Sequence, residues 1–311
     1  MKFFLKKIVV FTLIIASISI CSILLPATPK ASSSLLFASF DKDLLLEKID
    51  SSRIIFIGGS NLSFGLNSQI FKDSLDLNPI NTSIHAGIGI NFMLNHHLSK
   101  IDSGDIVVVV PEYTQYFANY ADGEEALLRL VLDTKYTGIE NISFGQFKNT
   151  VQFFPKFVLS KYNPFEYLVE KSPTKPIYER NSFNAYGDAV AHWEQTPKPF
   201  VCENISKMEL NESVFTNIVN FKNEIDKKNA TLVISFPCYD NESFEINSKQ
   251  IKKVYFELKK RKLLVLGNPN LFSFKKEFFF NSPYHLTKKG AEFRTLILVD
   301  LIKNKSELQH N

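Results

Sequence analysis

The stretch that most constrains the fold is a buried-strand pattern that ends in a glycine turn. Residues 54–57 form a short apolar run rich in β-branched side chains, which is typical of a fully buried strand. Gly58-Gly59-Ser60-Asn61 follows and must turn sharply, and a helical pattern then begins with Asn67 or Ser68 as its cap. This order places the Ser60 hydroxyl at the carboxyl end of a sheet strand, where open α/β sheets hold ligands. An ordinary strand-to-helix turn also favours these residue types, so the stretch alone leaves both interpretations open.

Two further units of strand and helix predict a parallel sheet. Residues 79–84 have a second strand pattern that ends at His85-Ala-Gly-Ile-Gly-Ile-Asn91, and a helix is expected over 91–100. Residues 105–110 are the clearest buried strand and stop at Pro111-Glu112-Tyr113. Three such repeats within about sixty residues favour a parallel sheet covered by helices.

The last third of the chain returns to this rhythm. Helices are expected at 209–228 and 245–261, strands at 231–236 and 263–266, and a final helix at 291–303. We therefore predict an α/β fold over residues 51–306. Its form is a three-layer α/β/α sandwich whose parallel sheet has five strands in the order 2-1-3-4-5.

Residues 122–200 lose the rhythm and are expected to form an insertion, half helical and half loop, over the carboxyl edge of the sheet. Helical patterns cover 124–132 and 146–159, and Pro155 is expected to break or kink the second. Asp188 and His192 are four positions apart, which on a helix would place them on one face. A surface pair beside a packed tryptophan is the alternative.

The first thirty residues predict a membrane anchor. Lys2, Lys6 and Lys7 precede eighteen uncharged residues, 8–25, and Pro26 ends the run. No convincing small-x-small cleavage site follows, so we expect an uncleaved signal anchor rather than a removed signal peptide. Residues 31–50 are expected to form a juxtamembrane tether and a short helix. The bulk of the chain is therefore predicted to lie outside the cytoplasm.

Composition excludes some classes of function. The net charge of +4 is small for 311 residues, and no basic run alternates with aromatic residues, so nucleic acid is not an expected partner. Cys202 and Cys238 could pair in an oxidising compartment, but two free thiols are the preferred interpretation. The adjacent His96 and His97 would point to different sides of a helix, and no cluster has metal-ligand spacing. Neither a metal nor an organic cofactor is expected.

Three blocks of the sequence resemble the SGNH (GDSL-like) hydrolases. Gly58-Gly59-Ser60-Asn61 is similar to the first block, with Gly59 where better-known members carry Asp. His85-Ala-Gly-Ile-Gly resembles the second block, whose glycine amide helps to form the oxyanion hole. Tyr284-His285-Leu286-Thr287-Lys288-Lys289-Gly290 resembles the last block, which carries the catalytic histidine. More narrowly, the chain looks like a membrane-anchored bacterial branch that resembles SGNH proteins associated with polysaccharide acetyltransferases. The resemblance covers about 50–120 and 230–306, and it implies Ser60 as nucleophile and His285 as base.

The chain departs from the family pattern in two places. The third block usually supplies an asparagine to the oxyanion hole, but the matching position here is Pro111-Glu112-Tyr113. The acid expected shortly before the histidine is missing, and the nearest residues, Asn281 and Ser282, cannot stabilise an imidazolium as a carboxylate does. Three alternatives stay open: a more distant acid turns toward His285, a Ser-His dyad works with backbone help, or the site is degenerate. The distant candidates are Asp188, Asp240 and Glu112, and His192 is a further accessory residue.

The chemistry of these residues fits ester cleavage or acyl transfer. A serine hydroxyl is a poor nucleophile near neutral pH and needs a neighbouring base, for which histidine is suited. A tetrahedral oxyanion needs donors already in place. Candidate donors are the amides of Ser60 and of Gly87 or Gly89, with the side chain of Asn61 or Asn91 as an addition.

We therefore predict an extracytoplasmic SGNH-like ester hydrolase or O-acyltransferase that acts on a carbohydrate of the cell envelope. The aromatic-rich insertion is expected to form a sugar-binding wall, and a membrane-bound acyltransferase is an expected partner. The alternative is a catalytically silent SGNH-like scaffold in an assembly complex for envelope polysaccharide. A third interpretation is an esterase or thioesterase of small substrates.

Overall fold

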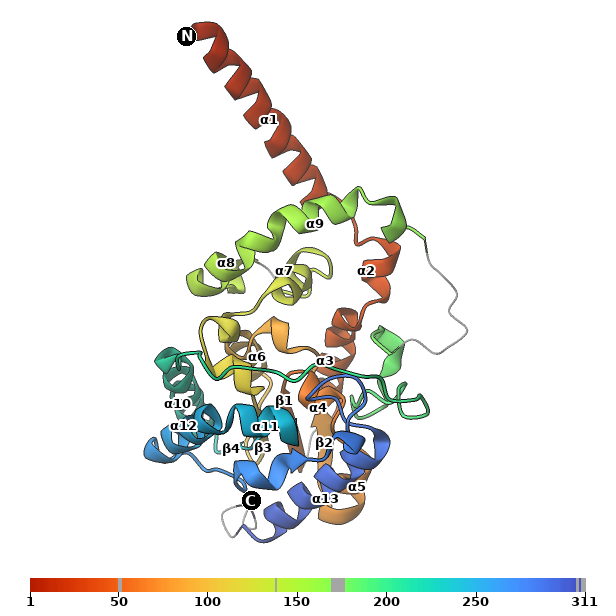
Figure 1. The fold of residues 1–311 in the computed structure, drawn as a ribbon, viewed down its shortest axis with the longest axis vertical. Coiled ribbons are helices and arrows are strands. Elements are labelled where there is room, and N and C mark those ends of the chain that lie inside the picture. Colours follow the sequence, from red (N-terminus) through yellow and green to blue (C-terminus); the bar gives the residue numbers. More distant parts are fainter. Residues whose placement is uncertain (50–51, 138, 169–176, 306–307, 309–311) are drawn as a thin grey trace.

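A parallel sheet of four strands forms the centre of the fold (Figure 1). The computed structural model describes all of the chain except residues 50–51, 138, 169–176, 306–307 and 309–311. The strands are β1 (Arg53–Gly58), β2 (Asn78–Asn81), β3 (Ile106–Val110) and β4 (Thr231–Ile234), in the order β2-β1-β3-β4. Every residue of β1 and β3 is buried, which explains their continuous apolar sequences.

The predicted fifth strand, 263–266, is reduced to one parallel bridge between Ile234 and Val265. The segment makes two backbone hydrogen bonds with Ile234, of 2.9 and 2.8 Å. It is short because Lys262 (φ 55°) precedes it and Gly267 (φ 76°) follows it, and both turn the chain. The five-stranded sheet was therefore a wrong prediction, whereas the parallel α/β class and the order of the first four strands are confirmed.

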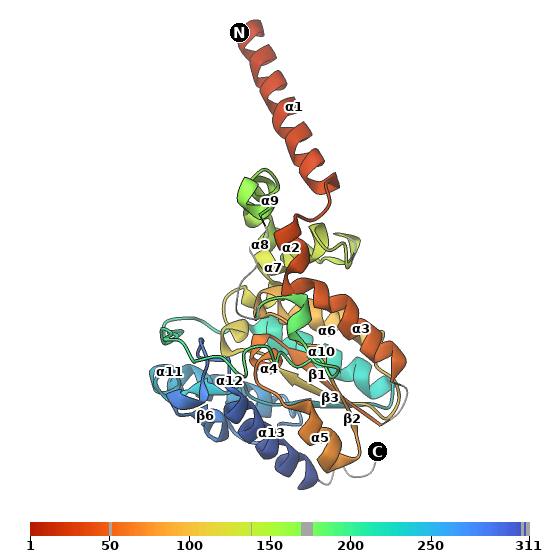
Figure 2. The same ribbon diagram turned by 90° about the vertical axis from the view of Figure 1, so that its right-hand side faces the viewer.

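Helices connect the strands and contact one another in pairs (Figures 1 and 2). Helix α6 (Ile90–Leu98) contacts α10 (Glu212–Lys227), and α5 (Ser68–Leu75) contacts α13 (Lys288–Lys303). The predicted helix 245–261 is instead two helices, α11 (Asn241–Ile246) and α12 (Ser248–Lys260). They divide at Asn247, because its side chain donates to the Glu203 carbonyl at 2.8 Å and accepts from the Ile205 amide at 2.8 Å. A separate two-stranded pair joins β5 (Tyr239–Asp240) to β6 (Ser273–Phe274).

The N-terminal helix α1 (Lys2–Leu24) is long and apolar enough to cross a membrane. The segment after it is folded rather than a loose tether, since it contains α2 (Pro29–Ser33) and α3 (Ala38–Lys48). The insertion contributes α7 (Glu125–Leu132), α8 (Phe144–Thr150) and α9 (Phe154–Lys161). The predicted interruption near Pro155 is confirmed, because α8 ends at Thr150, a 3-10 turn follows, and α9 begins at Phe154 with Pro155 in its first turn.

The segment around Asp188 is a tight hairpin rather than a helix, so the predicted shared face with His192 was wrong. Phe183 pairs antiparallel with Ala189, and Gly187 lies at the turn with φ 90°. A β-carbon on Gly187 would lie 2.2 Å from the Asn81 carbonyl oxygen, so only glycine allows this approach. The hairpin is held by the buried Lys42 of α3, which donates to the carbonyls of Asn81, Ser83 and Gly187 at 2.6–2.9 Å. Burial lowers the pKa of Lys42 to about 7.

One ion pair fastens the amino ends of β1 and β3, and it generates a stability prediction. Arg53 binds Asp105 through Nε at 2.8 Å and Nη2 at 2.5 Å, and these side chains are only 3% and 4% exposed. Asp105→Asn removes the buried charge partner of Arg53 and leaves only the exposed Asp102, so we expect the free energy of unfolding to fall by about 3 kcal/mol. Asp102 also binds Arg53, but its side chain is 74% exposed. The control Asp102→Asn should therefore cost less than about 1 kcal/mol in urea unfolding of the full chain in detergent. Equal losses from both variants would contradict this account.

Candidate active site

The turn between β1 and α4 (Ser60–Ser63) places Ser60 at the carboxyl edge of the sheet. Two glycines allow it, because a β-carbon at Gly58 would lie 2.5 Å from the Val110 carbonyl oxygen, and one at Gly59 would lie 2.8 Å from the Ala86 β-carbon. The end of β1 therefore packs directly against β3 and the loop after β2. Ser60 begins α4 and is 8% exposed.

Glu112 follows β3 and is the hydrogen-bond partner of Ser60. Its Oε1 accepts from the Ser60 hydroxyl at 2.9 Å and from the Asn61 amide at 3.0 Å. Burial raises the pKa of Glu112 to about 7, and repulsion from Glu203 adds to this, although the bonds from Ser60 and Asn61 oppose it. The carboxyl is therefore balanced between its charged and neutral forms near neutral pH.

Three of the proposed oxyanion donors, Gly87, Gly89 and Asn91, are engaged within the protein. The Gly87 amide donates to His85 Nδ1 at 3.0 Å, and the Gly89 amide donates to the Ala86 carbonyl at 2.8 Å. The Asn91 side chain donates to Asp122 at 2.8 Å and accepts from Asn217 at 3.0 Å. Asn91 therefore serves to join α6 to its neighbours, and its prediction as a donor at the Ser60 site was wrong.

Asn61 is also a structural residue, so its side chain is not a free donor. It is fully buried, and its Nδ2 donates to the Val110 carbonyl at 3.1 Å. Arg294 of α13 donates to the Asn61 carbonyl at 2.6 Å and to Asn61 Oδ1 at 3.2 Å. The sequence interpretation missed Arg294, although it is a charge on the apolar stripe that contains Ala291 and Leu298.

The loop before α13 brings His285 to the same turn. The Leu286 amide donates to the Phe64 carbonyl at 3.1 Å, and the Phe64 amide donates to the Ser60 carbonyl at 2.9 Å. The His285 ring stacks on Phe64 with 4.3 Å between centroids and 18° between planes. Ser60 and His285 are therefore linked through Phe64, although no hydrogen bond joins them in the part of the chain that the structure describes.

Asn281 holds the His285 ring in one orientation. His285 Nδ1 lies 2.9 Å from Asn281 Oδ1, and Asn281 Nδ2 donates to the Tyr178 hydroxyl at 2.7 Å. The Tyr178 hydroxyl thereby holds the other end of the amide. Because an amide oxygen only accepts, Nδ1 carries the proton and Nε2 keeps its lone pair. Burial lowers the pKa of His285 to about 3, and the neighbouring His192 and His85 add to the effect.

None of the distant acids turns toward His285, so that alternative was wrong for all three. Asp188 accepts from the Ser68 amide and hydroxyl at 2.7 and 2.8 Å. Asp240 caps α11 by accepting from the Ser243 amide at 3.1 Å, and Glu112 binds Ser60. His192 donates from Nε2 to the Leu286 carbonyl at 2.8 Å and thereby supports the loop that carries His285.

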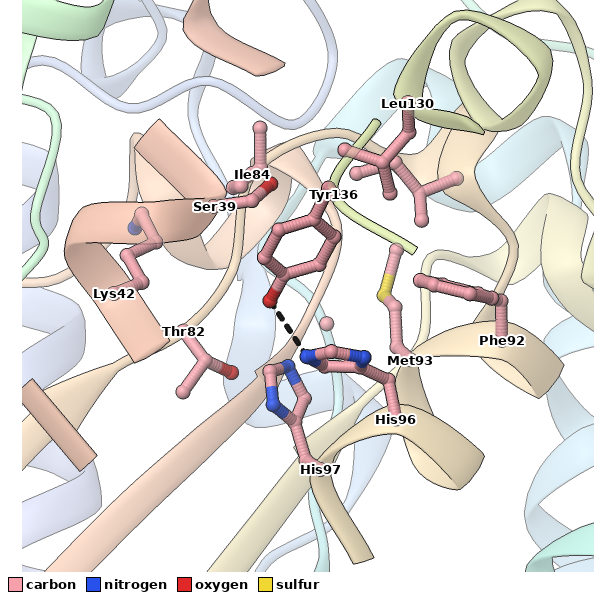
Figure 3. Close-up of a pocket in the computed structure, with 12 residues that line it drawn as sticks. Ser39, Lys42, Thr82, Ile84, Phe92, Met93, His96, His97, Leu130 and Tyr136 are labelled. Carbon is pink, nitrogen blue, oxygen red and sulfur yellow. Dashed lines mark hydrogen bonds between the residues drawn. The ribbon is translucent and has the colours of Figure 1, made fainter. Parts of the chain in front are cut away.

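A second cluster of histidines lies beside a small cavity of about 20 Å³ (Figure 3). The His96 and His97 rings pack 5.1 Å apart, so the prediction that they point to different sides was wrong. His96 Nε2 lies 3.0 Å from Asp43 and 2.6 Å from the Tyr136 hydroxyl. Asp43, His96 and His97 could together offer ligand atoms to a metal, but Lys100 already pairs with Asp43 at 3.2 Å.

A second group of possible metal ligands includes one cysteine. Cys202, Asp240 and Glu242 also have ligand atoms within 4.8 Å of one another. Cys202 and Cys238 are both free, in agreement with the preferred interpretation of two thiols. Burial raises the pKa of Cys238 to about 12, which makes it an unreactive packing residue.

The geometry around His285 predicts its titration. We expect its imidazole to stay neutral with the proton on Nδ1 until the pH falls toward 3. Asn281→Asp should raise the pKa of His285 by more than about one unit, since a carboxylate stabilises the imidazolium. Nitrogen chemical shifts of ¹⁵N-histidine-labelled protein measure both effects. A ring that titrates near its ordinary pKa of about 6.5 would show that His285 is solvated instead.

Comparison with known proteins does not extend the sequence resemblance. No protein-family model matches this chain, and no curated protein gives a significant match. The functional assignment therefore depends on the geometry of Ser60, Glu112, Asn281 and His285.

Proposed function

We propose that the protein is an SGNH-like ester hydrolase or O-acyltransferase that acts on a carbohydrate outside the cytoplasm. One observation carries the proposal: the turn 60–64 holds a serine hydroxyl and also the ring on which His285 stacks. That histidine presents an unprotonated Nε2, because Asn281 engages Nδ1. A nucleophile, a base and a group that orients the base are thus assembled at one end of the sheet.

The reaction follows from these positions. The Ser60 hydroxyl turns from Glu112 toward the substrate, and its oxygen attacks the ester carbonyl carbon while its proton passes to His285 Nε2. The tetrahedral intermediate collapses, and the leaving alcohol takes that proton, so that the acyl group stays on Ser60. Water or a sugar hydroxyl then attacks this ester with His285 as base, and Ser60 is regenerated.

We propose that Glu112 takes the place of the asparagine that the family's third block supplies. Its Oε1 accepts from Ser60 and Asn61, and the side chain also accepts from the Gln115 amide in a capping box. When the group is neutral, we propose that Oε2 carries the proton. A neutral carboxylic acid donates a hydrogen bond to an oxyanion, whereas a carboxylate repels it. The pKa of about 7 keeps a large fraction of Glu112 in the donating form.

This role predicts the pH dependence of the reaction. Esterase activity should fall as the pH rises through about 7, because ionised Glu112 loses its donor. Glu112→Gln keeps a donor and should remove that fall, whereas Glu112→Ala should lower kcat by about 10²–10³-fold. The measurement is kcat/KM for 4-nitrophenyl acetate from pH 5 to 9, with Ser60→Ala as the blank. Activity that rises through pH 7 and disappears in Glu112→Gln would identify Glu112 as a base.

A specific observation favours the second candidate, a catalytically silent scaffold in an envelope-polysaccharide assembly. The amides of Gly87 and Gly89 are engaged, and His285 has an amide partner in place of a carboxylate. An imidazolium at His285 would therefore have little stabilisation. The two candidates differ in whether Ser60 matters to the cell.

Two variants separate the candidates. Asn281→Asp supplies the missing negative charge beside His285 and should raise kcat/KM by up to about 10⁴-fold. The opposite substitution, Asp to Asn, lowers kcat by about that factor in a Ser-His-Asp triad. Ser60→Ala should abolish hydrolysis and labelling by a fluorophosphonate probe. If Ser60→Ala keeps the full cellular role and Asn281→Asp changes nothing, the enzyme proposal fails and the scaffold remains.

The arrangement of the whole chain fits this proposal. We propose that α1 anchors the protein, with Lys2, Lys6 and Lys7 on the cytoplasmic side, and that the three-layer α/β/α domain lies outside. A membrane-bound acyltransferase that delivers acyl groups to Ser60 is the partner that this position suits.

A further inference from the structure

The insertion has an exposed apolar surface that the site does not use. It lies on α8, α9 and the turns before, between and after them, and we call it the insertion surface. Isolated exposed apolar residues are normal, but a contiguous group indicates an interaction site. Phe165, for example, is 71% exposed. The members of the insertion surface are Ile139, Phe144, Phe147, Val151, Leu159, Tyr162, Phe165, Tyr167 and Leu168.

The insertion surface lies beside the end of the anchor helix. Figures 1 and 2 both place α8 and α9 between α1 and the sheet, away from α4. Helix α9 contacts α1 directly, since the Tyr162 hydroxyl accepts from Ser22 at 3.3 Å and donates to the Ile18 carbonyl at 3.4 Å. Lys161 donates to the Pro26 carbonyl at 2.9 Å and to Asp133 at 2.6 Å. These bonds hold α9 at a set height along the anchor.

The level at which α9 contacts α1 matches the interface between headgroups and acyl chains of a bilayer that α1 would cross. Helix α1 has 23 residues, which at 1.5 Å per residue gives a length of about 35 Å, slightly more than the hydrocarbon core of about 30 Å. Ile18 lies six residues before the last residue of α1, Leu24, so its carbonyl is about 9 Å from that end. Amphipathic elements insert about 5–10 Å into the region between headgroups and acyl chains. Tyr162 is therefore at interfacial depth, and aromatic residues favour that depth.

An apolar cavity of about 260 Å³ opens in the same region. Ile23 of α1 contributes to its wall, together with side chains of α7, α8 and α9 such as Leu128, Phe147 and Phe154. Thr150 is its one polar lining residue, and its hydroxyl is already bonded to the Gln146 carbonyl at 2.8 Å. A hydrocarbon chain fits these walls, whereas a sugar would find no free hydrogen-bond partner.

We propose that the insertion surface lies in the outer leaflet of the membrane that α1 crosses, and that lipid acyl chains enter its cavity. The bilayer is the occupant because α1 itself brings this surface to the depth of the acyl chains. The aromatic residues here contact lipid and do not form the sugar-binding wall expected from the sequence. The proposal does not depend on catalysis at Ser60.

Fluorescence quenching tests the proposal on the full chain in vesicles of phosphatidylcholine brominated on its acyl chains. Trp193 is replaced first, by Trp193→Phe, because its Nε1 makes no hydrogen bond in the described structure. Phe165→Trp then reports on the insertion surface, and Phe154→Trp, which lines the cavity and is not part of the insertion surface, reports on the cavity. Both exchanges keep an aromatic ring, so the fold is expected to survive. We expect brominated lipid to quench each reporter by more than half relative to unbrominated lipid.

The matched control is Phe256→Trp. Phe256 is 65% exposed on α12, which Figure 1 places at the opposite end of the molecule from α1. Its emission should be the same in both lipids. Emission from Phe165→Trp that is as insensitive as that of Phe256→Trp would overturn the membrane contact. Quenching of Phe165→Trp with none at Phe154→Trp would overturn the entry of acyl chains into the cavity.

Discussion

The buried guanidinium of Arg294 is the interaction on which the candidate site depends. It donates to Asn61 from the last helix and reaches the Phe236 carbonyl after β4 at 3.4 Å. No carboxylate pairs with it in the described chain, and burial lowers the pKa of Arg294. Its donors satisfy carbonyl groups that would otherwise be buried without partners. The first strand-to-helix turn and the segment after β4 are therefore both held to α13 by one side chain.

Burial then gives the site an unusual electrostatic character. It raises the pKa of Glu112 and lowers the pKa of His285, so both groups are shifted toward their neutral forms. A site of this kind cannot offset an imidazolium by charge, and it must stabilise the transition state by hydrogen bonds alone. The same property suits a scaffold, for which uncharged buried groups are simply the least costly to fold.

The helices α8 and α9 of the insertion lie between the N-terminal helix α1 and the candidate site. Figure 1 places α8 and α9 near α1, while α4, which begins with Ser60, lies farther from α1. Under the proposal that α1 crosses the membrane, the bonds of Lys161 and Tyr162 to the end of α1 would set the distance of the domain from the lipid. A polymer or acyl donor at the membrane surface would meet the site in a restricted geometry.

The sequence by itself determined β1, β3 and β4, because each is a short and mostly apolar run between turn residues. It also indicated Ser60 and His285 as site candidates, since each lies within a block of sequence with a recognisable pattern. The partner of His285 was only one of several candidates, and the choice of Asn281 came from the position of Tyr178, more than a hundred residues earlier.

Only the tertiary structure decided the remaining features. Glu112 binds Ser60 because β3 lies beside β1, and Asp188 is withdrawn to Ser68 because a glycine hairpin packs on β2. The side chain of Asn91 is engaged by Asp122 and Asn217, neighbours that no spacing in the sequence reveals. The physical reason is that hydrogen bonds between distant segments depend on how those segments pack, whereas a strand or a helix is set by the periodicity of its own residues.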